Sequence, residues 1–208
     1  MVSHNGDLSA QIREVTLQAE ECVDVVYPEV ELRNQAVANR INAEITRQVN
    51  ALSQSDNCQI NVTGRYEVNV NEKGVLSINL QFYRIPVMAA NGLNIQKSIN
   101  VALATGKNYR LNELFRSDSH YRIRLNEIIK RQIEERDIPM IKEFTGISDY
   151  EDYYLTEDSL VVYFQELEYT IHAYGIPEFV IPYRLIDDII REDALIGMLL
   201  SEDSRSVV

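Results

Sequence analysis

The alternation of apolar and polar residues between residues 66 and 82 constrains the fold of this chain most. Tyr66, Val68 and Val70 alternate with polar residues, and the following segment 71–74 ends in a glycine, which readily adopts positive φ. A strand that buries one face and leaves the other in solvent is typical of an antiparallel sheet. The pattern predicts a hairpin whose return strand carries Leu76, Ile78, Leu80 and Phe82 on one face and Ser77, Asn79 and Gln81 on the other, solvated face.

The segment that precedes this hairpin predicts strand and then helix. Residues 12–26 are rich in β-branched types, which favour one or two strands, and Pro28 interrupts that run. Asn34 is a suitable N-cap for a helix whose apolar residues recur at intervals of four and three. These positions, which we expect to pack on a sheet, are Val37, Ile41, Ile45, Val49 and Leu52.

The second half predicts further strands grouped together, with helices between the groups. Because strands that cluster in meanders are typical of α+β proteins, we expect an α+β fold with antiparallel sheets and helices packed on one face. The expected strands are 94–104, 153–155, 160–164 and 179–181. The expected helices are a short turn at 111–115, a longer helix from Ser117 or Asp118 to about 136, a short helix opened by Pro139, and a last helix from 183 that continues through 195–199.

The charge of the chain is strongly negative and unevenly distributed. The net charge is −12, from 20 basic and 32 acidic residues. A negative field repels phosphate backbones, so we expect no nucleic-acid partner. From Glu143 to Tyr183 the chain has no Lys or Arg. Such a stretch is either a solvated face or an acidic docking surface for a basic protein or peptide.

The acidic stretch is also rich in tyrosine, which is common at protein interfaces. The chain has 12 tyrosines and no tryptophan. Packing of strands, with the hydroxyl group reaching water, accounts for most tyrosines in such a sequence. The candidate binding residues on an acidic, Tyr-rich surface are Asp149, Glu151, Asp152, Glu157, Asp158, Tyr163, Tyr169 and Tyr174.

Motifs for catalysis and for metal or cofactor binding are absent from the sequence. The glycines are too far apart for dinucleotide-binding or P-loop patterns, and there is no G-x-S-x-G elbow. The three histidines and two cysteines lack the short spacings of a zinc site. Acids in turn sequence are expected to be solvated rather than to form a catalytic pair. We therefore predict no catalytic residue, no metal and no cofactor.

The two cysteines and the N-terminus bear on the compartment. Cys22 lies in an apolar run, so we expect a buried free thiol, while a Cys22–Cys58 disulfide would require an oxidising compartment. The N-terminus lacks the features of a signal peptide, and no apolar run is long enough to cross a bilayer, so we expect no membrane insertion. The sequence as printed is expected to be cytoplasmic, whereas a piece of a secreted protein would be extracytoplasmic.

Two stretches in the second half resemble a known domain. The stretches are 154–164, which reads YLTEDSLVVYF, and 173–183, which reads AYGIPEFVIPY. They are similar to the extracytoplasmic RsiV-type domain of an anti-sigma factor, which also occurs in the deacetylase PdaC. The segment 104–107 followed by 111–115 supports the likeness. Residues 27–28 with 33–45 resemble the small domain that usually precedes it.

The resemblance implies a bacterial α+β protein and a division into parts. These are residues 7–93, resembling the PdaC-associated domain, residues 94–190, resembling the RsiV-type domain, and a helical or polar tail at 191–208. In the anti-sigma factor this region binds lysozyme, a basic protein. The family's membrane span and the deacetylase metal motif are both missing here, and residues 88–92 replace a Gly-Gly-Ala-His-like segment of the family.

Three hypotheses about function follow. The leading one is a non-enzymatic binding module that recognises a basic protein such as lysozyme. The second is a cell-wall-related hydrolase that uses the acidic loops, which would need two carboxylates that face each other in a closed cleft. The third is a purely structural or oligomerising protein, which predicts an exposed apolar patch at 195–200.

Overall fold

The computed structural model describes residues 8–17 and 21–201 and confirms the α+β class. In this part of the chain, the strands form a six-stranded sheet with the order β1-β2-β3-β4-β5-β6 and a three-stranded sheet with the order β7-β8-β9. The first sheet consists of β1 (Gln11–Leu17), β2 (Val23–Glu31), β3 (Ile60–Glu72), β4 (Val75–Pro86), β5 (Leu93–Ala102) and β6 (Lys107–Asn108). The second sheet consists of β7 (Tyr153–Leu155), β8 (Ser159–Tyr163) and β9 (Glu178–Pro182), and the α-helices are α1 (Gln35–Leu52), α2 (Tyr121–Glu135) and α3 (Leu195–Leu200).

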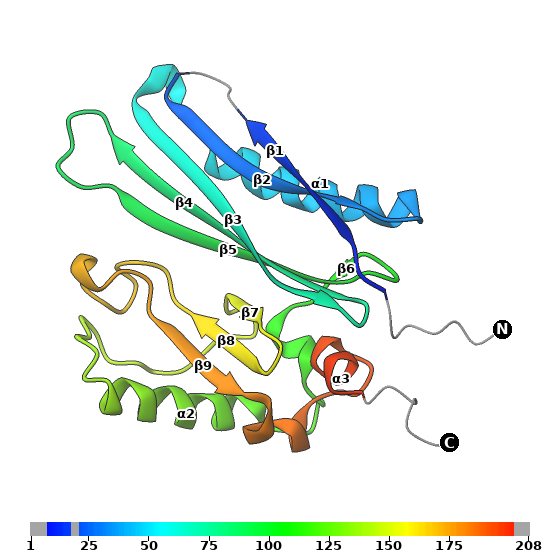
Figure 1. Ribbon diagram of the computed structural model, residues 1–208. Coiled ribbons are helices and arrows are strands. Elements are labelled where there is room, and N and C mark those ends of the chain that lie inside the picture. Colours follow the sequence, from blue (N-terminus) through cyan, green and yellow to red (C-terminus); the bar gives the residue numbers. More distant parts are fainter. Residues whose placement is uncertain (1–7, 18–20, 202–208) are drawn as a thin grey trace.

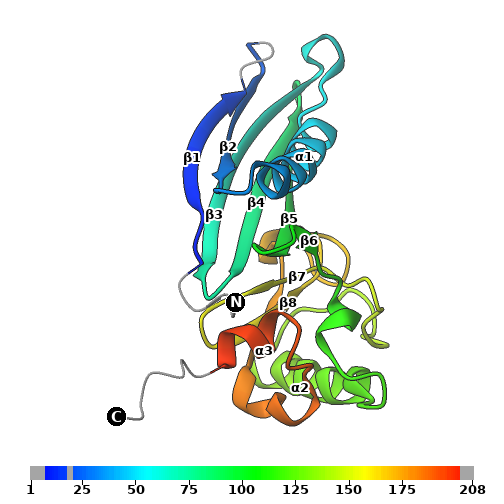
Figure 2. The ribbon, with the colours of Figure 1, turned by 90° about the vertical axis from the view of Figure 1, so that its right-hand side faces the viewer.

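Helix α1 covers one face of the first sheet (Figure 2). Its N-cap is Asn34, as predicted, and the Asn34 side chain accepts hydrogen bonds from the backbone N–H groups of Ala36 and Val37. The predicted apolar stripe from Val37 to Val49 is buried against the sheet. The helix connects β2 to β3, which pair in parallel, whereas the other neighbouring strands of this sheet are antiparallel.

The predicted hairpin is formed by β3 and β4 with a shorter turn than expected. Strand β3 extends to Glu72, so only Lys73 and Gly74 remain between the strands. Both have positive φ, 49° and 78°, which matches the twist of a two-residue hairpin turn. Strand β5 pairs along β4 and belongs to the same sheet, so the division expected at residues 93 and 94 separates two paired strands.

The second face of the first sheet is only partly solvated, which corrects the expectation from the alternation. Ser77 and Asn79 are buried at 0% and 1% exposure, whereas Gln81 is exposed. Ser77 accepts a hydrogen bond from the N–H group of Leu155 in β7 at 3.0 Å. The cause of the burial is therefore the second sheet, whose strand β7 lies across this face (Figure 1).

The second sheet packs on α2 and α3 and has its own apolar core. Leu125, Ile128 and Ile129 are buried on α2, as predicted, but the N-cap is His120 rather than Ser117 or Asp118. Strand β9 is one of the two edge strands of this sheet, and α2 lies along its edge. Gln132 and Arg136 of α2 donate hydrogen bonds to backbone carbonyl oxygens of β9, which shields this edge from pairing with another chain.

Two predicted helices take other conformations. The segment after Pro139 is not helical, because Met140 forms a β-bridge with Thr170 and the N–H group of Ile141 donates to the Tyr169 carbonyl. The last predicted helix is broken into two 3₁₀ turns at 183–185 and 187–189, followed by α3.

Helix α3 does not provide the exposed apolar patch that the hypothesis of an oligomerising protein predicts. Leu195, Ile196 and Leu199 are buried at 0%, 0% and 4% exposure. The Lys73 ammonium group donates to the Leu199 carbonyl at 2.7 Å and ties α3 to the β3–β4 hairpin. Residues 202–208, the rest of the predicted tail, lie outside the described residues. The same holds for residue 7, the first of the predicted N-terminal part.

The expectation of a buried free thiol at Cys22 is wrong. Cys22 and Cys58 form a disulfide bond, and their Cα atoms are 5.6 Å apart. Cys22 directly precedes β2 and Cys58 lies shortly before β3. The N–H group of Val62 also donates to the Cys22 carbonyl, so the disulfide lies where the parallel pairing of β2 and β3 begins.

None of the helices in residues 8–17 and 21–201 combines the length and the apolar character that a bilayer-crossing helix needs.

Candidate functional site

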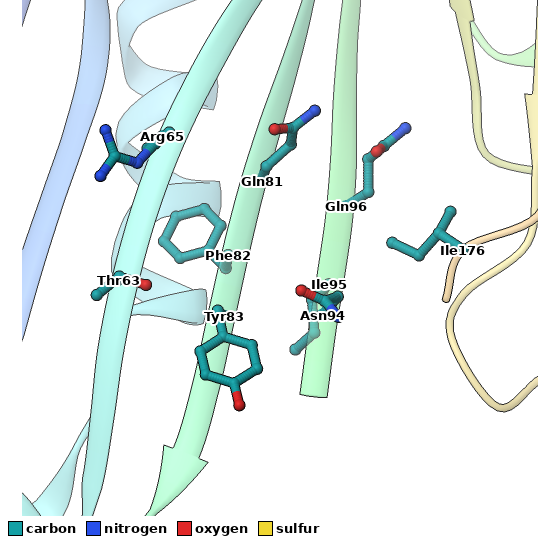
Figure 3. A pocket seen from close by; sticks show the side chains of 9 residues that line it. All are labelled: Thr63, Arg65, Gln81, Phe82, Tyr83, Asn94, Ile95, Gln96 and Ile176. Carbon is teal, nitrogen blue, oxygen red and sulfur yellow. The ribbon is translucent and has the colours of Figure 1, made fainter. Parts of the chain in front are cut away.

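A groove lies on the open part of the first sheet's second face. Its volume is about 330 Å³, and Ile176, from the loop that precedes β9, forms one wall (Figure 3). The floor contains six side chains from three neighbouring strands. In the strand register these form two rows, Arg65–Gln81–Gln96 and Thr63–Tyr83–Asn94.

The rows are a direct consequence of strand pairing. Residues directly opposite each other in an antiparallel pair have Cβ atoms about 4.5–5.5 Å apart. Because side chains alternate between faces, odd-numbered positions of β3 and β4 meet even-numbered positions of β5 on this face. Polar residues at these positions therefore gather into one continuous polar surface.

Three polar side chains of the groove have no partner within the described part of the protein. The side chains of Thr63, Arg65 and Gln81 are exposed, and none of them has a hydrogen bond or ion pair with the described residues. Gln96 is 4% exposed and donates to the Glu178 carboxylate at 3.2 Å. The Tyr83 hydroxyl group accepts from the Gly92 N–H group, which holds its ring in place.

A buried carboxylate fixes the rim of the groove. Glu166 is fully buried in its side chain and accepts hydrogen bonds from the backbone and side-chain nitrogens of Asn94 at 2.6 and 2.9 Å. Its other oxygen pairs with Nδ1 of His172, whose side chain is partly exposed. Gln165 donates to the Gln96 carbonyl and accepts from the Gln96 N–H group, so side chains cap the free edge of β5 here.

The structure separates the eight residues predicted as a binding surface into several neighbourhoods. Asp149 lies beside α2, where it accepts hydrogen bonds from Tyr121 and, at 2.8 Å, from Arg122. Burial and the Asp149 carboxylate raise the pKa of Tyr121 to about 12. This corner borders a second hollow of about 500 Å³, whose charged groups pair with one another or with nearby residues, as Asp149 does with Arg122.

Glu151 and Asp152 lie with Glu168 in what we call the acidic cluster. Asp152 pairs with Lys97 at 2.7 Å and also accepts from Gln165. Among the described residues, Glu151 accepts hydrogen bonds only from Ser148, and Glu168 accepts from the Gln165 N–H group. Burial, and then the negative charges of Glu168 and Asp152, raise the pKa of Glu151. Glu151 and Glu168 thus repel each other, and neither has an ion pair with a described residue.

Glu157 and Asp158 lie in the turn between β7 and β8, and both are exposed. Asp158 accepts hydrogen bonds from the hydroxyl groups of Thr156 and Ser159, which stabilise the turn. The predicted acids therefore divide among the α2 corner, the acidic cluster and this turn.

Two of the three predicted tyrosines lie inside the molecule rather than on its surface. Tyr163 is fully buried, and its hydroxyl group hydrogen-bonds with Ser98 at 2.8 Å. Tyr169 is 8% exposed and packs edge-on against Phe164. Tyr174 is partly exposed, and its hydroxyl group accepts from Arg136. The expectation that all three tyrosines form a surface is thus corrected for Tyr163 and Tyr169.

Metal-ligating side chains do not gather in the described part of the chain. No group of three or more His, Cys, Asp or Glu side chains among residues 8–17 and 21–201 is arranged to hold a metal ion.

The groove has no signature in the sequence. The alternation predicts Gln81 on the polar face of the hairpin, but Thr63, Arg65 and Asn94 belong to no motif. The signal that could have identified them is the register, because three paired strands with polar residues at facing positions define one surface. That register depends on the bulge between Val68 and Val70, which the sequence pattern does not specify.

Comparison with known proteins supports the fold and leaves the activity open. Residues 112–184 match the family model described as a protein of unknown function, DUF3298. A DUF3298 family member from Bacteroides fragilis has a similar structure, with a TM-score of 0.68 and 14% identity over 96% of this chain and 100% of its own. A DUF3298 family protein from Pseudomonas aeruginosa gives a TM-score of 0.65 and 13% identity over the same shares. No curated protein matches the sequence significantly. At these identities the likeness shows a shared fold.

Proposed function

We propose that the chain is a non-enzymatic binding module that recognises a basic protein, such as lysozyme, through its acidic cluster and the exposed acids around it. The observation that carries the proposal is that Glu151 and Glu168, neighbours in the acidic cluster, have no ion pair with a described residue. A cationic side chain of a partner placed between these carboxylates would relieve the repulsion and gain a charge-assisted hydrogen bond.

The surroundings of the cluster support a protein ligand. Tyr150, next to Glu151 in sequence, is 69% exposed. Tyrosine supplies apolar area together with a hydrogen-bonding tip, a combination that is common in interfaces. The resemblance to the RsiV-type domain, a region that binds lysozyme in the anti-sigma factor, points in the same direction.

The non-enzymatic part of the proposal is supported by how the predicted acids are placed. Hydrolysis with two acids needs carboxylates that face each other in a closed cleft. Asp149 is engaged by Arg122 and Asp152 by Lys97, while Glu157 and Asp158 lie in an exposed turn. Salt-bridged and solvated carboxylates are poor candidates for a proton donor near neutral pH. Burial raises the pKa of Glu151, but this residue lines neither the groove nor the second hollow.

Calorimetric titration with lysozyme tests the proposal. We expect binding at low ionic strength that weakens by at least about tenfold between about 20 mM and 0.3 M salt, because exposed charges are screened. The double variant Glu151→Gln/Glu168→Gln should weaken binding by at least about tenfold at low salt. Absence of heat at low salt would contradict the lysozyme form of the proposal.

The matched control removes two other negative charges, which lie away from the acidic cluster. Glu21 and Glu72 are exposed, lie in the first sheet's turn regions and have no ion pair with a described residue. The variant Glu21→Gln/Glu72→Gln should bind lysozyme as the unaltered protein does. Equal losses in both double variants would mean that net charge alone attracts lysozyme, and the assignment to the acidic cluster would then be wrong.

A further inference from the structure

We propose that the groove on β3, β4 and β5 is a separate binding site for an acidic saccharide, a sugar that carries one carboxylate, and that Arg65 is the partner of this carboxylate. The site differs in residues and in charge from the acidic cluster to which the basic-protein proposal refers. Its volume of about 330 Å³ lies at the lower end of the range of about 300–1,000 Å³ that is typical of small-molecule sites.

The charge of the expected ligand follows from Arg65. The chain has a net charge of −12, and most of the arginines in the described residues pair with acids or backbone carbonyls. Arg65, on the groove floor, has no such partner among the described residues, although Glu67 is on the same face of β3. A guanidinium group presents a planar set of donors that matches a carboxylate with two parallel hydrogen bonds.

The other polar side chains that line the groove suit a ligand that carries hydroxyl groups. The side-chain amide of Gln81, beside Arg65 in the register, offers both a donor and an acceptor, and so does the Thr63 hydroxyl group. A sugar hydroxyl group is also both donor and acceptor, so each such contact satisfies both partners. The ring of Tyr83 and the side chain of Ile176 supply apolar contact for the carbon skeleton (Figure 3).

Other ligand classes fit less well. An extended peptide would bind by pairing with the free edge of β5, but Gln165 and Glu166 already occupy the N–H groups of Gln96 and Asn94. A polyanion would be repelled by Glu166 and Glu178, which contact the lining residues Asn94 and Gln96. A single carboxylate on a neutral polar body is the chemistry that remains.

The decisive measurement is an NMR titration of the isotope-labelled protein with methyl β-D-glucuronide, and with methyl β-D-glucoside as the uncharged match. We expect the glucuronide to shift the amide signals of Arg65, Gln81 and Gln96 with millimolar affinity and the glucoside to bind at least about tenfold more weakly. No shift up to about 20 mM glucuronide, or equal binding of the two sugars, would overturn the proposal.

Variants then locate the carboxylate contact. Arg65→Gln should weaken glucuronide binding to the level of the glucoside, whereas Arg33→Gln, which removes an exposed arginine elsewhere, should leave binding unchanged. Both variants should unfold at the same temperature as the unaltered protein, because neither arginine has a partner among the described residues. If Arg65→Gln binds normally, or if tri-alanine shifts the same signals more strongly than the glucuronide, the site belongs to another ligand and the proposal fails.

The two proposals are tested independently. The variant Glu151→Gln/Glu168→Gln, designed to weaken lysozyme binding, leaves all six polar residues of the groove floor in place. It should therefore bind the glucuronide normally, and Arg65→Gln should bind lysozyme at least as well as the unaltered protein. Loss of both activities in either variant would indicate a folding defect or one shared site, contrary to what we propose.

Discussion

The second face of the six-stranded sheet has a covered half and an open half, and both are built from polar residues. The covered half consists of Ser77, Asn79, Ser98 and Asn100, which lie under the second sheet. The open half consists of the six polar residues of the groove. In the covered half, Ser77 donates to Asn100 at 2.7 Å, and Asn100 donates to the Tyr153 carbonyl of β7 at 2.8 Å. In the open half, Thr63, Arg65 and Gln81 have no partner among the described residues.

The difference shows what buried polar residues do in this fold. Strand β7 has an outer edge whose N–H and C=O groups need partners, because unsatisfied buried backbone groups are costly. Ser77 and Asn100 provide these partners, through the Leu155 N–H group and the Tyr153 carbonyl. Polar residues in the covered half therefore join the two sheets. In the open half, Thr63, Arg65 and Gln81 contribute little to folding and are available to a ligand.

Reduction of the disulfide bond should produce the largest difference between the open half and the covered half. Cys22 and Cys58 close a loop with a sequence separation of 36, and loss of such a constraint destabilises by about 4 kcal/mol. The bond lies where β2 and β3 begin, near the open half, which has no second sheet over it. Hydrogen exchange should therefore accelerate most at the start of β2 and β3 on reduction. Uniform acceleration, including Ser77 and Asn100, would contradict this division.

The next largest effect should come from Asn100→Ala in the covered half. The substitution removes the donor to the buried Tyr153 carbonyl and the acceptor of the Ser77 hydroxyl group. Leaving these groups unsatisfied should lower the free energy of unfolding by about 2–4 kcal/mol in urea denaturation.

Gln81→Ala is the matched change in the open half. Gln81 is exposed and has no side-chain hydrogen bond with the described residues, so its removal should change the free energy of unfolding by less than about 0.5 kcal/mol. Equal effects of Asn100→Ala and Gln81→Ala would mean that the covered half does not join the sheets in the way that its hydrogen bonds indicate.

Local periodicity was sufficient to predict much of the fold. The apolar stripe of α1, the β3–β4 hairpin and the three strands of the second sheet follow from spacing within single segments. The helix expected after Pro139 failed because pairing of Met140 with Thr170, 30 positions away, holds the segment in an extended conformation. The last predicted helix failed for a similar reason, since Ile190 forms a bridge with Phe115.

The candidate sites could not be predicted to the same extent, because they depend on contacts between distant segments. Ser77 and Gln81 occupy equivalent positions in the alternation of β4, and only the placement of β7 makes one buried and the other exposed. In the same way, Tyr163 and Tyr174 both lie in the acidic stretch, but one is in the core and the other is partly exposed. Because Cys22 and Cys58 belong to no recognisable motif, the sequence does not reveal that they form a disulfide bond.

The last prediction is a pH dependence near the edge of β5, where Asp152 binds Lys97 and Gln165. Burial and nearby acids raise the pKa of the neighbouring Glu151 above its value in the unfolded chain. A raised pKa means that the folded state binds the proton more tightly, so Glu151 favours folding below its unfolded pKa and loses this contribution as the pH rises through its folded pKa.

Glu151→Gln cannot ionise, so the stability difference between the variant and the unaltered protein should shift in favour of the variant as the pH rises from about 4 to 7. Because Glu151 is partly solvated, this shift should stay below about 1 kcal/mol in urea denaturation. A shift in the opposite direction would mean that the Ser148 hydrogen bonds outweigh burial and the repulsion from Glu168 and Asp152.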